Sequence, residues 1–329
     1  MLNNYSIGPL KNLIIFGSAP YLNEIEDHCI KSNINFFFIT TKSQLNKLER
    51  RPKNILVLEK INENKIRYFL KINNFDQSCL AISISARWIF KKKFIKDFLN
   101  YRLLNTHGTR LPLDRGGGNF TWKIMRGDRL GNILFHIVDE GIDTGQIIIN
   151  EEYIIPSNKI KPFEIINDYR LRLKLRILKL VKDTKKKKLI FNPIVQQKNI
   201  STYNPRINTE VNGYINWDWS PHDIQNFILS FDEPYTGAKT LLNKKVVSLK
   251  STQLHMGEIG SHPFQSGVII RKSKGWCIVS LKKGYTLIIE EVINQKNKNI
   301  IKNLKLGDKF YTTFAKLEKS KAYRAVIKN

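Results

Sequence analysis

The sequence is poor in cysteine and has no long uninterrupted apolar segment. Its three cysteines, Cys29, Cys79 and Cys277, lie far apart among 329 residues, so they form neither a disulfide framework nor the paired spacing of a zinc site. Although 42% of the residues are hydrophobic, no apolar run approaches the roughly 20 residues that a transmembrane helix needs. These absences favour a soluble, core-forming protein in a reducing compartment, and we expect a cytoplasmic location with no membrane insertion.

Two further signals are missing near the N-terminus. The opening residues, MLNNYSIGPLKNLIIFG, lack the basic start, apolar run and small-residue cleavage site of a signal peptide, so secretion is not expected. The first glycine-containing turn, at Gly17, does not read G-x-G-x-x-G. A dinucleotide site therefore has little support.

Acidic residues are scarce compared with basic ones. The chain holds 28 Asp and Glu against 55 Lys and Arg, a formal net charge of +27. Such an excess is typical of nucleic-acid-binding proteins, but here it is spread over the whole chain. The run Lys185–Lys188 follows a predicted helix, where positive charge is favourable in its own right. We therefore favour a generally basic surface over a dedicated nucleic-acid face.

In the first half of the chain, short apolar runs alternate with segments of helical spacing. The runs that predict buried strands cover residues 13–17, 34–39, 55–58 and 79–84, and the helical segments cover 21–32, 60–72 and 90–100. This alternation predicts an α/β fold with a Rossmann-like, mostly parallel sheet and helices on both faces. Long helical periodicity over 163–183 predicts one more helix.

The second half of the chain has a different residue pattern. Residues 190–208 are polar and contain two prolines, which predicts a linker. A helix is expected over 221–230, capped by Ser220. Short β segments follow at 267–271, 276–281 and 287–293, after a strand pair that turns at Asn243–Lys244. This pattern predicts a smaller β-rich, OB-like barrel. The expected division is one domain over 1–189, a linker over 190–208 and a C-terminal domain over 209–329.

Polar residues with complementary chemistry gather between Leu103 and Ile149. Asn105 and His107 are two residues apart, so both can face one way at a strand end. The triplet Gly116–Gly118 allows backbone to approach a ligand closely. A turn rich in carboxylates, DEGIDTG, covers residues 139–145. An amide to bind an oxyanion, an imidazole to move a proton and a carboxylate to orient it together suit acyl transfer.

The motifs N-x-H-G-x-x-L-P, R-G-G and H-x-x-D-E-G-I-D-T-G resemble those of the formyltransferase family that uses 10-formyltetrahydrofolate. That family includes glycinamide ribonucleotide, methionyl-tRNA and nucleotide-sugar amine formyltransferases. The resemblance implies a catalytic triad of Asn105, His107 and Asp143. By position in the turn alone, Asp139 or Glu140 could equally supply the carboxylate of the triad. Only the family motif selects Asp143. No metal is implied.

The resemblance also implies binding residues. The folate co-substrate is expected to contact Ser85, Ala86, Arg87 and Trp88 in one loop, and Asp139, Glu140, Gly141 and Ile142 in another. Arg115, Gly116 and Gly117 are expected to lie against an anionic part of the acceptor. The sequence departs from the usual family pattern at Arg110 and Gly117. Trp88 alone is also compatible with a core aromatic, and His136 is expected to pack inside its apolar run.

The acceptor amine is the main question left open. The pattern I-N-W…F-D-x-P-Y-x-G-A resembles the C-terminal domain of methionyl-tRNA formyltransferases and of the aminoarabinose enzyme of lipid A modification. The tRNA enzymes carry a long basic insertion after the second strand, whereas here residues 39–45 pass quickly into a helical segment. A nucleotide-linked amino sugar is therefore the first expectation, and initiator methionyl-tRNA is the alternative. A non-catalytic basic binding protein forms a third class, and the sequence leaves a homo-oligomer open.

Overall fold

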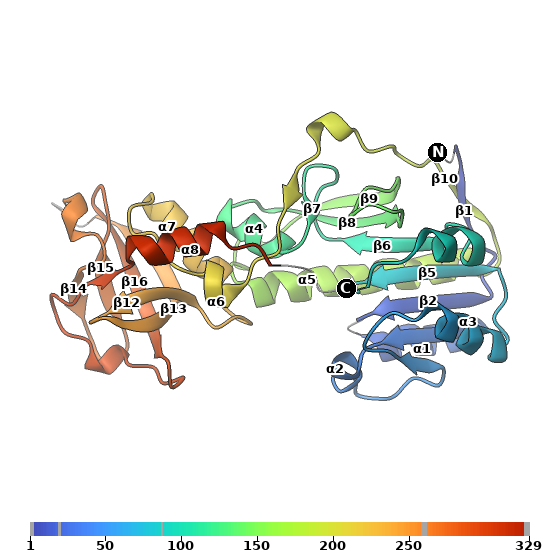
Figure 1. Cartoon of the computed structure of the whole chain (residues 1–329), viewed down its shortest axis with the longest axis horizontal. Coiled ribbons are helices and arrows are strands. Elements are labelled where there is room, and N and C mark those ends of the chain that lie inside the picture. The colour runs from blue at the N-terminus through green and yellow to red at the C-terminus, as the bar shows by residue number, and fades with distance from the viewer. Residues whose placement is uncertain (1–2, 19–20, 87, 258–261, 326–329) are drawn as a thin grey trace.

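The computed structural model describes residues 3–18, 21–86, 88–257 and 262–325. The larger part of the molecule is built on a seven-stranded sheet (Figure 1). Its strands, in spatial order, are β4 (Ile55–Val57), β3 (Asn35–Thr40), β2 (Asn12–Gly17), β5 (Cys79–Ile84), β6 (Leu103–His107), β8 (Leu130–Ile137) and β9 (Ile147–Ile154). The first five are parallel, whereas β8 runs antiparallel to both β6 and β9. The predicted mostly parallel sheet is confirmed.

Helices cover both faces of this sheet. The covering elements are α1 (Leu22–Lys31) and α5 (Pro162–Thr184) on one face, and α3 (Glu63–Ile72) and the π-helix η1 (Phe94–Phe98) on the other. Alternate residues of β2 enter the two cores, Leu13 and Ile15 on the α1 side and Ile14 and Phe16 on the α3 side. A strand buried on both faces is apolar throughout, which explains why β2 and β5 appear in the sequence as continuous apolar runs.

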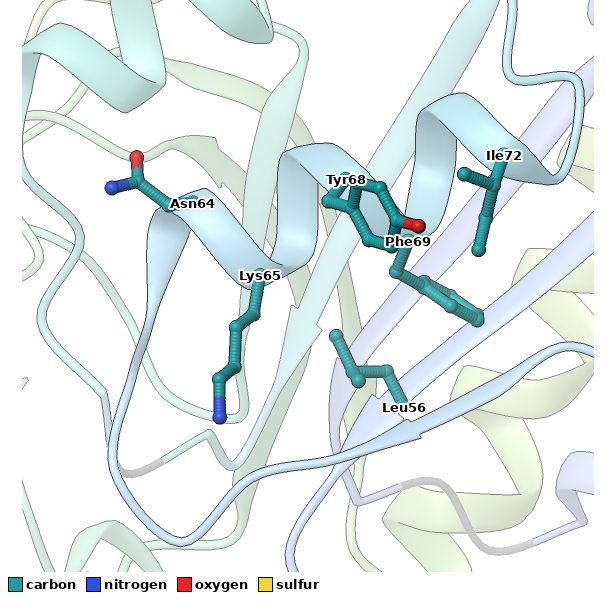
Figure 2. A pocket seen from close by; sticks show the side chains of 6 residues that line it. All are labelled: Leu56, Asn64, Lys65, Tyr68, Phe69 and Ile72. Atoms are coloured by element: carbon teal, nitrogen blue, oxygen red, sulfur yellow. The ribbon is translucent and has the colours of Figure 1, made fainter.

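A shallow apolar groove lies on the outer surface beside α3 (Figure 2). Tyr68 and Ile72 are exposed there, and Phe69 and Leu56 complete its apolar lining. None of the predicted site residues lines this groove. Among the described residues, no helix has both the length and the apolar character needed to cross a bilayer.

The second part of the molecule is a curled six-stranded antiparallel sheet. Its strands, in spatial order, are β14 (Ile269–Lys272), β15 (Cys277–Ser280), β16 (Tyr285–Asn294), β13 (Lys245–Met256), β12 (Ala238–Leu242) and β17 (Phe310–Tyr311). The edges return to each other, because Ile269 donates to the Asp308 carbonyl at 2.8 Å and Phe310 to the Gly267 carbonyl at 2.8 Å. This closure confirms the predicted OB-like barrel.

The barrel is filled from one side by α7 (Pro221–Ser230), whose Ile224 and Ile228 enter its core. Ser220 caps this helix as predicted, accepting from the Asp223 backbone N–H. The expected turn at Asn243–Lys244 is also present, with both residues at positive φ. The remaining helices are α2 (Lys42–Leu45), α4 (Asn119–Met125), α6 (Thr209–Asn212), α8 (Phe314–Ala322), η2 (Lys198–Ile200), η3 (Pro263–Gln265) and η4 (Ile301–Asn303).

The segment 190–208, expected to be loop-like, instead contributes two short strand pairings. β10 (Leu189–Phe191) pairs antiparallel with β1 (Tyr5–Ile7), and β11 (Tyr203–Asn204) pairs parallel with β7 (Arg115–Gly116). Each pairing involves two or three residues and a partner far away in sequence, so hydrophobic periodicity gives no sign of it. The expected domain limits at 189 and 209 stay a prediction.

Candidate active site

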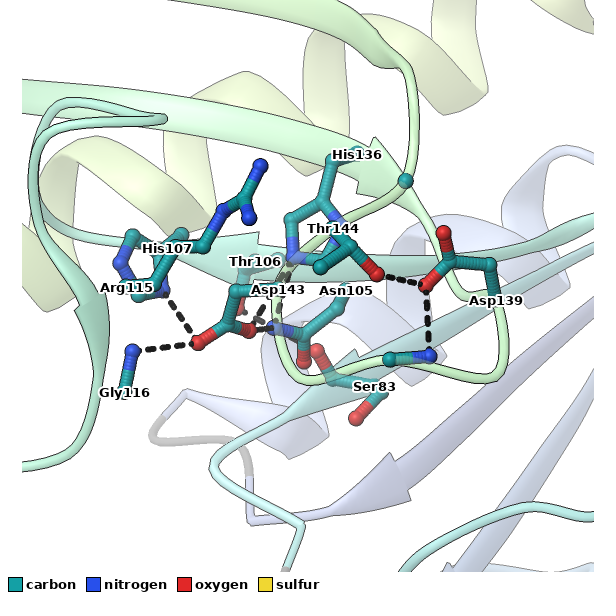
Figure 3. A network of polar contacts seen from close by, with 12 residues as sticks. Ser83, Asn105, Thr106, His107, Arg115, Gly116, His136, Asp139, Asp143 and Thr144 are labelled. Carbon is teal, nitrogen blue, oxygen red and sulfur yellow. Dashed lines mark hydrogen bonds and ion pairs between the residues drawn. The ribbon is translucent and has the colours of Figure 1, made fainter. Parts of the chain in front are cut away.

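The three residues of the predicted triad meet at the carboxyl end of β6. Asn105 and His107 lie on this strand, and Asp143 lies in the turn between β8 and β9 at a φ of 54°. Asn105 Nδ2 is 3.4 Å from Asp143 Oδ1, and His107 Nδ1 is 3.8 Å from Asp143 Oδ2 (Figure 3). Sites in open α/β sheets form at such strand ends. The structure thus brings together an amide, an imidazole and a carboxylate.

The Asp143 carboxylate is held from several directions. The Gly116 backbone N–H donates to Oδ2 at 2.9 Å. The backbone of the turn is fixed by Gln196, whose Nε2 donates to the carbonyls of Asp143 at 3.0 Å and Gly145 at 2.6 Å. Position 145 admits only glycine, because an added Cβ would lie 1.8 Å from the Ile137 carbonyl oxygen. Asp143 is therefore a preorganised group.

Burial and neighbouring charges set the protonation of this cluster. Burial lowers the pKa of His107 below its ordinary value, and the Asp143 carboxylate only partly opposes this effect. Burial alone would raise the pKa of Asp143. This pKa is instead lowered to about 2 by a hydrogen bond and charge from His136, by the charge of His107 and by the hydrogen bond from the Gly116 N–H. At neutral pH the site therefore pairs a neutral imidazole with an ionised carboxylate.

His136, expected to pack inside its apolar run, is a fourth member of the cluster. It is buried, but its Nε2 lies 3.2 Å from Asn105 Nδ2 and 3.4 Å from Asp143 Oδ1 (Figure 3). Its Nδ1 lies 2.9 Å from the Ile137 carbonyl oxygen and must donate to it, since a carbonyl only accepts. Nε2 then accepts from Asn105 when the ring is neutral and can donate to Asp143 when the ring is protonated. His136 therefore orients the Asn105 amide, which the periodicity of β8 could not reveal.

Comparison with protein families agrees with this arrangement. The formyl transferase family model matches residues 11–161, and the model of the formyl transferase C-terminal domain matches residues 208–306. The chain belongs to the formyl transferase family. The resemblance seen in the sequence motifs is thereby confirmed.

Two relatives of this formyl transferase chain are methionyl-tRNA formyltransferases. Methionyl-tRNA formyltransferase of Clostridium perfringens (strain SM101 / Type A) is 26% identical over 202 residues, which are 61% of this chain and 62% of the relative. That of Syntrophus aciditrophicus (strain SB) is 29% identical over 214 residues, 63% of this chain and 64% of the relative. The match thus spans less than two thirds of the length of these relatives.

Solved structures share the fold of this formyl transferase chain. An N-formyltransferase from Helicobacter canadensis, in complex with folinic acid and dTDP-3-aminofucose, has a TM-score of 0.61 at 18% identity and covers 85% of this chain and 99% of its own. Methionyl-tRNA formyltransferase from Clostridium thermocellum has a TM-score of 0.53 at 20% identity, covering 74% of this chain and 93% of its own.

A large cavity surrounds the triad of this formyl transferase chain. Its volume is about 1360 Å³, and Asn105, His107, His136 and Asp143 all line it. The residues expected to contact folate that also line it are Ser85, Ala86, Trp88, Asp139, Glu140, Gly141 and Ile142. Arg87 lies outside the described residues. Ile142, with Ile89, stays exposed at this end of the cavity, and exposed apolar side chains beside open backbone suit a flat aromatic ring.

The expected acceptor residues Arg115, Gly116 and Gly117 have different positions. Both glycines line the cavity, but the Arg115 guanidinium turns to Gln196, donating to Oε1 from Nε at 3.1 Å and from Nη2 at 2.9 Å. The expected contact of Arg115 with an acceptor anion stays a prediction, and its side chain is seen in contact with Gln196. Arg115 holds Gln196, and Gln196 holds the Asp143 turn. Nothing in the local sequence marks Gln196 for this task.

Replacing His136 by phenylalanine is expected to lower kcat by about 10- to 100-fold, because a misplaced catalytic amide costs rate without loss of the amide itself. The substitution keeps an aromatic ring in a buried position while removing the nitrogen that faces Asn105. Steady-state kinetics, with thermal unfolding as a check on packing, measures the effect. An unchanged kcat in a stably folded variant would remove His136 from the catalytic arrangement.

Asp143 is expected to make stability depend on pH in the acid range. Its folded pKa of about 2 lies below the ordinary 3.8, so the ionised form favours folding. This contribution is present above about pH 4 and is lost as pH falls through 2, and it amounts to about 2 kcal/mol. Urea unfolding at pH 6 and pH 2 should show a larger loss for the wild type than for Asp143→Asn. Equal losses would contradict the assignment.

Proposed function

We propose that this protein transfers a formyl group from 10-formyltetrahydrofolate to the primary amine of a nucleotide-linked amino sugar. The observation that carries the proposal is the convergence of Asn105, His107 and Asp143 in the wall of one large cavity. Family membership supports formyl transfer as the chemistry. The Helicobacter canadensis neighbour, in complex with folinic acid and a dTDP-linked amino sugar, supports both substrates.

Each member of the cluster has a defined task in this proposal. The folate supplies the formyl group, whose bond to folate N10 breaks as the bond to the acceptor nitrogen forms. Asn105 donates an amide N–H to the formyl oxygen, on which negative charge develops. To do so, Asn105 Nδ2 gives up its 3.4 Å contact with Asp143 and keeps the shorter one with His136.

The proton released by the acceptor amine goes to the pair of His107 and Asp143. His107 Nε2 is committed, because it lies 2.7 Å from the Asp114 carbonyl oxygen and must donate to it. Nδ1 is then the basic nitrogen, and it faces the Asp143 carboxylate at 3.8 Å. His107 is buried, and burial keeps it neutral and able to accept. The proton therefore reaches the imidazole by way of the more accessible carboxylate, which lines the cavity. The pair returns this proton to folate N10 as the bond between N10 and the formyl carbon breaks, so the leaving group departs as a neutral amine.

Initiator methionyl-tRNA is the second candidate acceptor, because the curated relatives named above are methionyl-tRNA formyltransferases. The structure favours the smaller acceptor in one respect. The connection between β3 and β4, residues 41–54, holds only the short helix α2 and a turn. Its Arg50 is pinned to α1 by ion pairs with Glu26 at 3.0 Å and Asp27 at 2.7 Å. This connection presents no long basic arm to an acceptor stem.

Formyl transfer from 10-formyltetrahydrofolate to two acceptors, compared side by side, tests the proposal. One is a panel of dTDP- and UDP-linked 3- and 4-amino sugars, and the other is charged initiator tRNA. We expect a sugar product, detected by mass spectrometry, that disappears in His107→Ala. Turnover of tRNA alone would replace the proposed acceptor. If neither the sugars nor the tRNA is formylated, the proposal is contradicted and a non-catalytic binding function takes its place.

A further inference from the structure

The wall of the cavity beside Gly116 is built by the segment that follows the α/β part. Tyr203, on β11, and Arg206, just after it, both line the cavity and are both exposed. Tyr203 leaves 54% of its surface accessible. Within the described ranges, no carboxylate forms an ion pair with Arg206. A guanidinium without a carboxylate partner and an exposed aromatic ring thus lie in the same wall of the cavity.

This wall is fixed in place. The Arg115 N–H donates to the Thr202 carbonyl at 3.1 Å and the Gly117 N–H to the Asn204 carbonyl at 3.0 Å. Trp122 Nε1 donates to the Pro205 carbonyl at 2.9 Å. These contacts flank Tyr203 on both sides and reach the residue before Arg206, so both side chains project from an anchored backbone.

Two glycines of the triplet, Gly116 and Gly117, allow this close approach. A Cβ at Gly116, where φ is 96°, would lie 2.3 Å from the Asn204 carbonyl oxygen and 2.7 Å from the Tyr203 ring. A Cβ at Gly117 would lie 3.1 Å from Arg206 Cβ. The glycines therefore admit the segment 203–206 to the cavity. Because Gly116 also donates to Asp143, this wall borders the catalytic carboxylate directly.

The wall lies away from the end expected to hold folate. Figure 3 shows Gly116 and Asp139 on opposite sides of Asp143. Ile142 belongs to the same turn as Asp139, and an ion pair between Lys92 and Glu140 at 2.7 Å joins the loop that carries Ile89 to this turn. An acceptor that meets the formyl group at Asp143 would then extend along the Gly116 side. Arg170 and Lys47 also line the cavity, as do the carboxylates Glu24 and Glu49. Glu49 is two residues from Lys47, and Glu24 pairs at 2.8 Å with Lys174, one helical turn after Arg170.

We propose that Tyr203 and Arg206 bind the nucleoside diphosphate half of the acceptor, the base stacked on Tyr203 and the phosphates at Arg206. A guanidinium matches phosphate oxygens with paired hydrogen bonds, and an aromatic ring stacks on any base. This inference rests on the proposed sugar-nucleotide function and assigns residues to its acceptor site. The segment 203–206 thereby sets acceptor specificity, while the triad performs the transfer.

Calorimetric titration of dTDP and UDP into the protein tests this assignment. Arg206→Ala is expected to weaken binding by about 10- to 100-fold, as for loss of a charged hydrogen bond. Tyr203→Leu should weaken it by about 10-fold, and Tyr203→Phe, which keeps the ring, should bind like the wild type. Lys198→Ala is the matched control, because Lys198 is exposed in the same segment but does not line the cavity.

Kinetics separate this role from a structural one. In Arg206→Ala the KM for the amino sugar should rise by the same factor as the dissociation constant for dTDP, while kcat and the KM for folate change little. Sugar formylation with an unchanged KM in Arg206→Ala would overturn the inference and leave the proposed function intact. Binding of dTDP that depends on Arg206, without formylation of any sugar, would contradict the proposed function but not the assignment of Arg206 to a diphosphate site. No binding of either diphosphate to the wild type would overturn the inference.

Discussion

Alanine in place of His107 is expected to reduce kcat for formyl transfer by about 100- to 10,000-fold, the range for loss of a general base. The residue is buried, its Nε2 is committed to the Asp114 carbonyl, and its Nδ1 faces the Asp143 carboxylate. Burial lowers the pKa of its imidazole, so it is neutral and able to accept a proton at pH 7. His136 Nε2 also lies near Asp143, 3.4 Å from Oδ1, but it contacts the Asn105 amide as well, at 3.2 Å.

Steady-state kinetics measures this loss, and two further variants make the result specific. His255→Ala removes an exposed histidine on β13 and should leave kcat unchanged. His107→Gln retains an N–H that can reach the Asp114 carbonyl and so preserves this anchor of the fold, but it supplies no base. We expect His107→Gln to be nearly as slow as His107→Ala. A kcat within about 10-fold of the wild type in His107→Gln would exclude His107 as the proton acceptor.

Alanine in place of Asn105 is expected to reduce kcat by about 100- to 1,000-fold, the usual effect of losing one donor to a developing oxyanion. The side chain is positioned by two neighbours, His136 at 3.2 Å and Asp143 at 3.4 Å. Since the charge on the formyl oxygen develops only during the reaction, the loss should appear in kcat and leave the KM values nearly unchanged. Single-turnover experiments measure the chemical step directly.

Asn105→Asp provides the matched comparison for this second prediction. The carboxylate has nearly the shape of the amide, but it cannot donate a hydrogen bond and it places a second negative charge beside Asp143. It should be at least as slow as Asn105→Ala. Binding of a folate analogue such as folinic acid should be retained in both variants. Full activity of Asn105→Asp would show that a donor at this position is not required.

Local sequence pattern predicted most of the fold and part of the site. Strands such as β5, buried on both faces, are apolar at nearly every position, Ser83 excepted, and the predicted bounds of β5 agree with the observed ones, 79–84. The long amphipathic helix α5 was predicted to within one residue at each end. Helix and strand periodicities are properties of contiguous residues, and so are the motifs that carry Asn105 and His107.

The features that sequence could not predict arise from contacts between distant residues. His136 reads as one more residue of a buried strand, and only the return of the 139–145 turn places Asp143 beside it. Gln196 reaches the carbonyls of Asp143 and Gly145 from a segment expected to be a loop. The same segment, through Tyr203, contacts the glycines that had been expected to face a ligand. Periodicity and composition carry no information about such pairings.

The pairing of β11 with β7 has a consequence for recombining this protein with its relatives. A chimaera joined at residue 189, the first residue of β10, would inherit the triad but exchange Gln196, Tyr203 and Arg206 for those of the other parent. Its barrel would be intact, yet its acceptor preference would follow the donor of the connecting segment. A crossover after residue 207 would instead transplant the barrel alone. The proposed acceptor site and the predicted triad would thus be inherited in units that do not coincide with the two folded bodies.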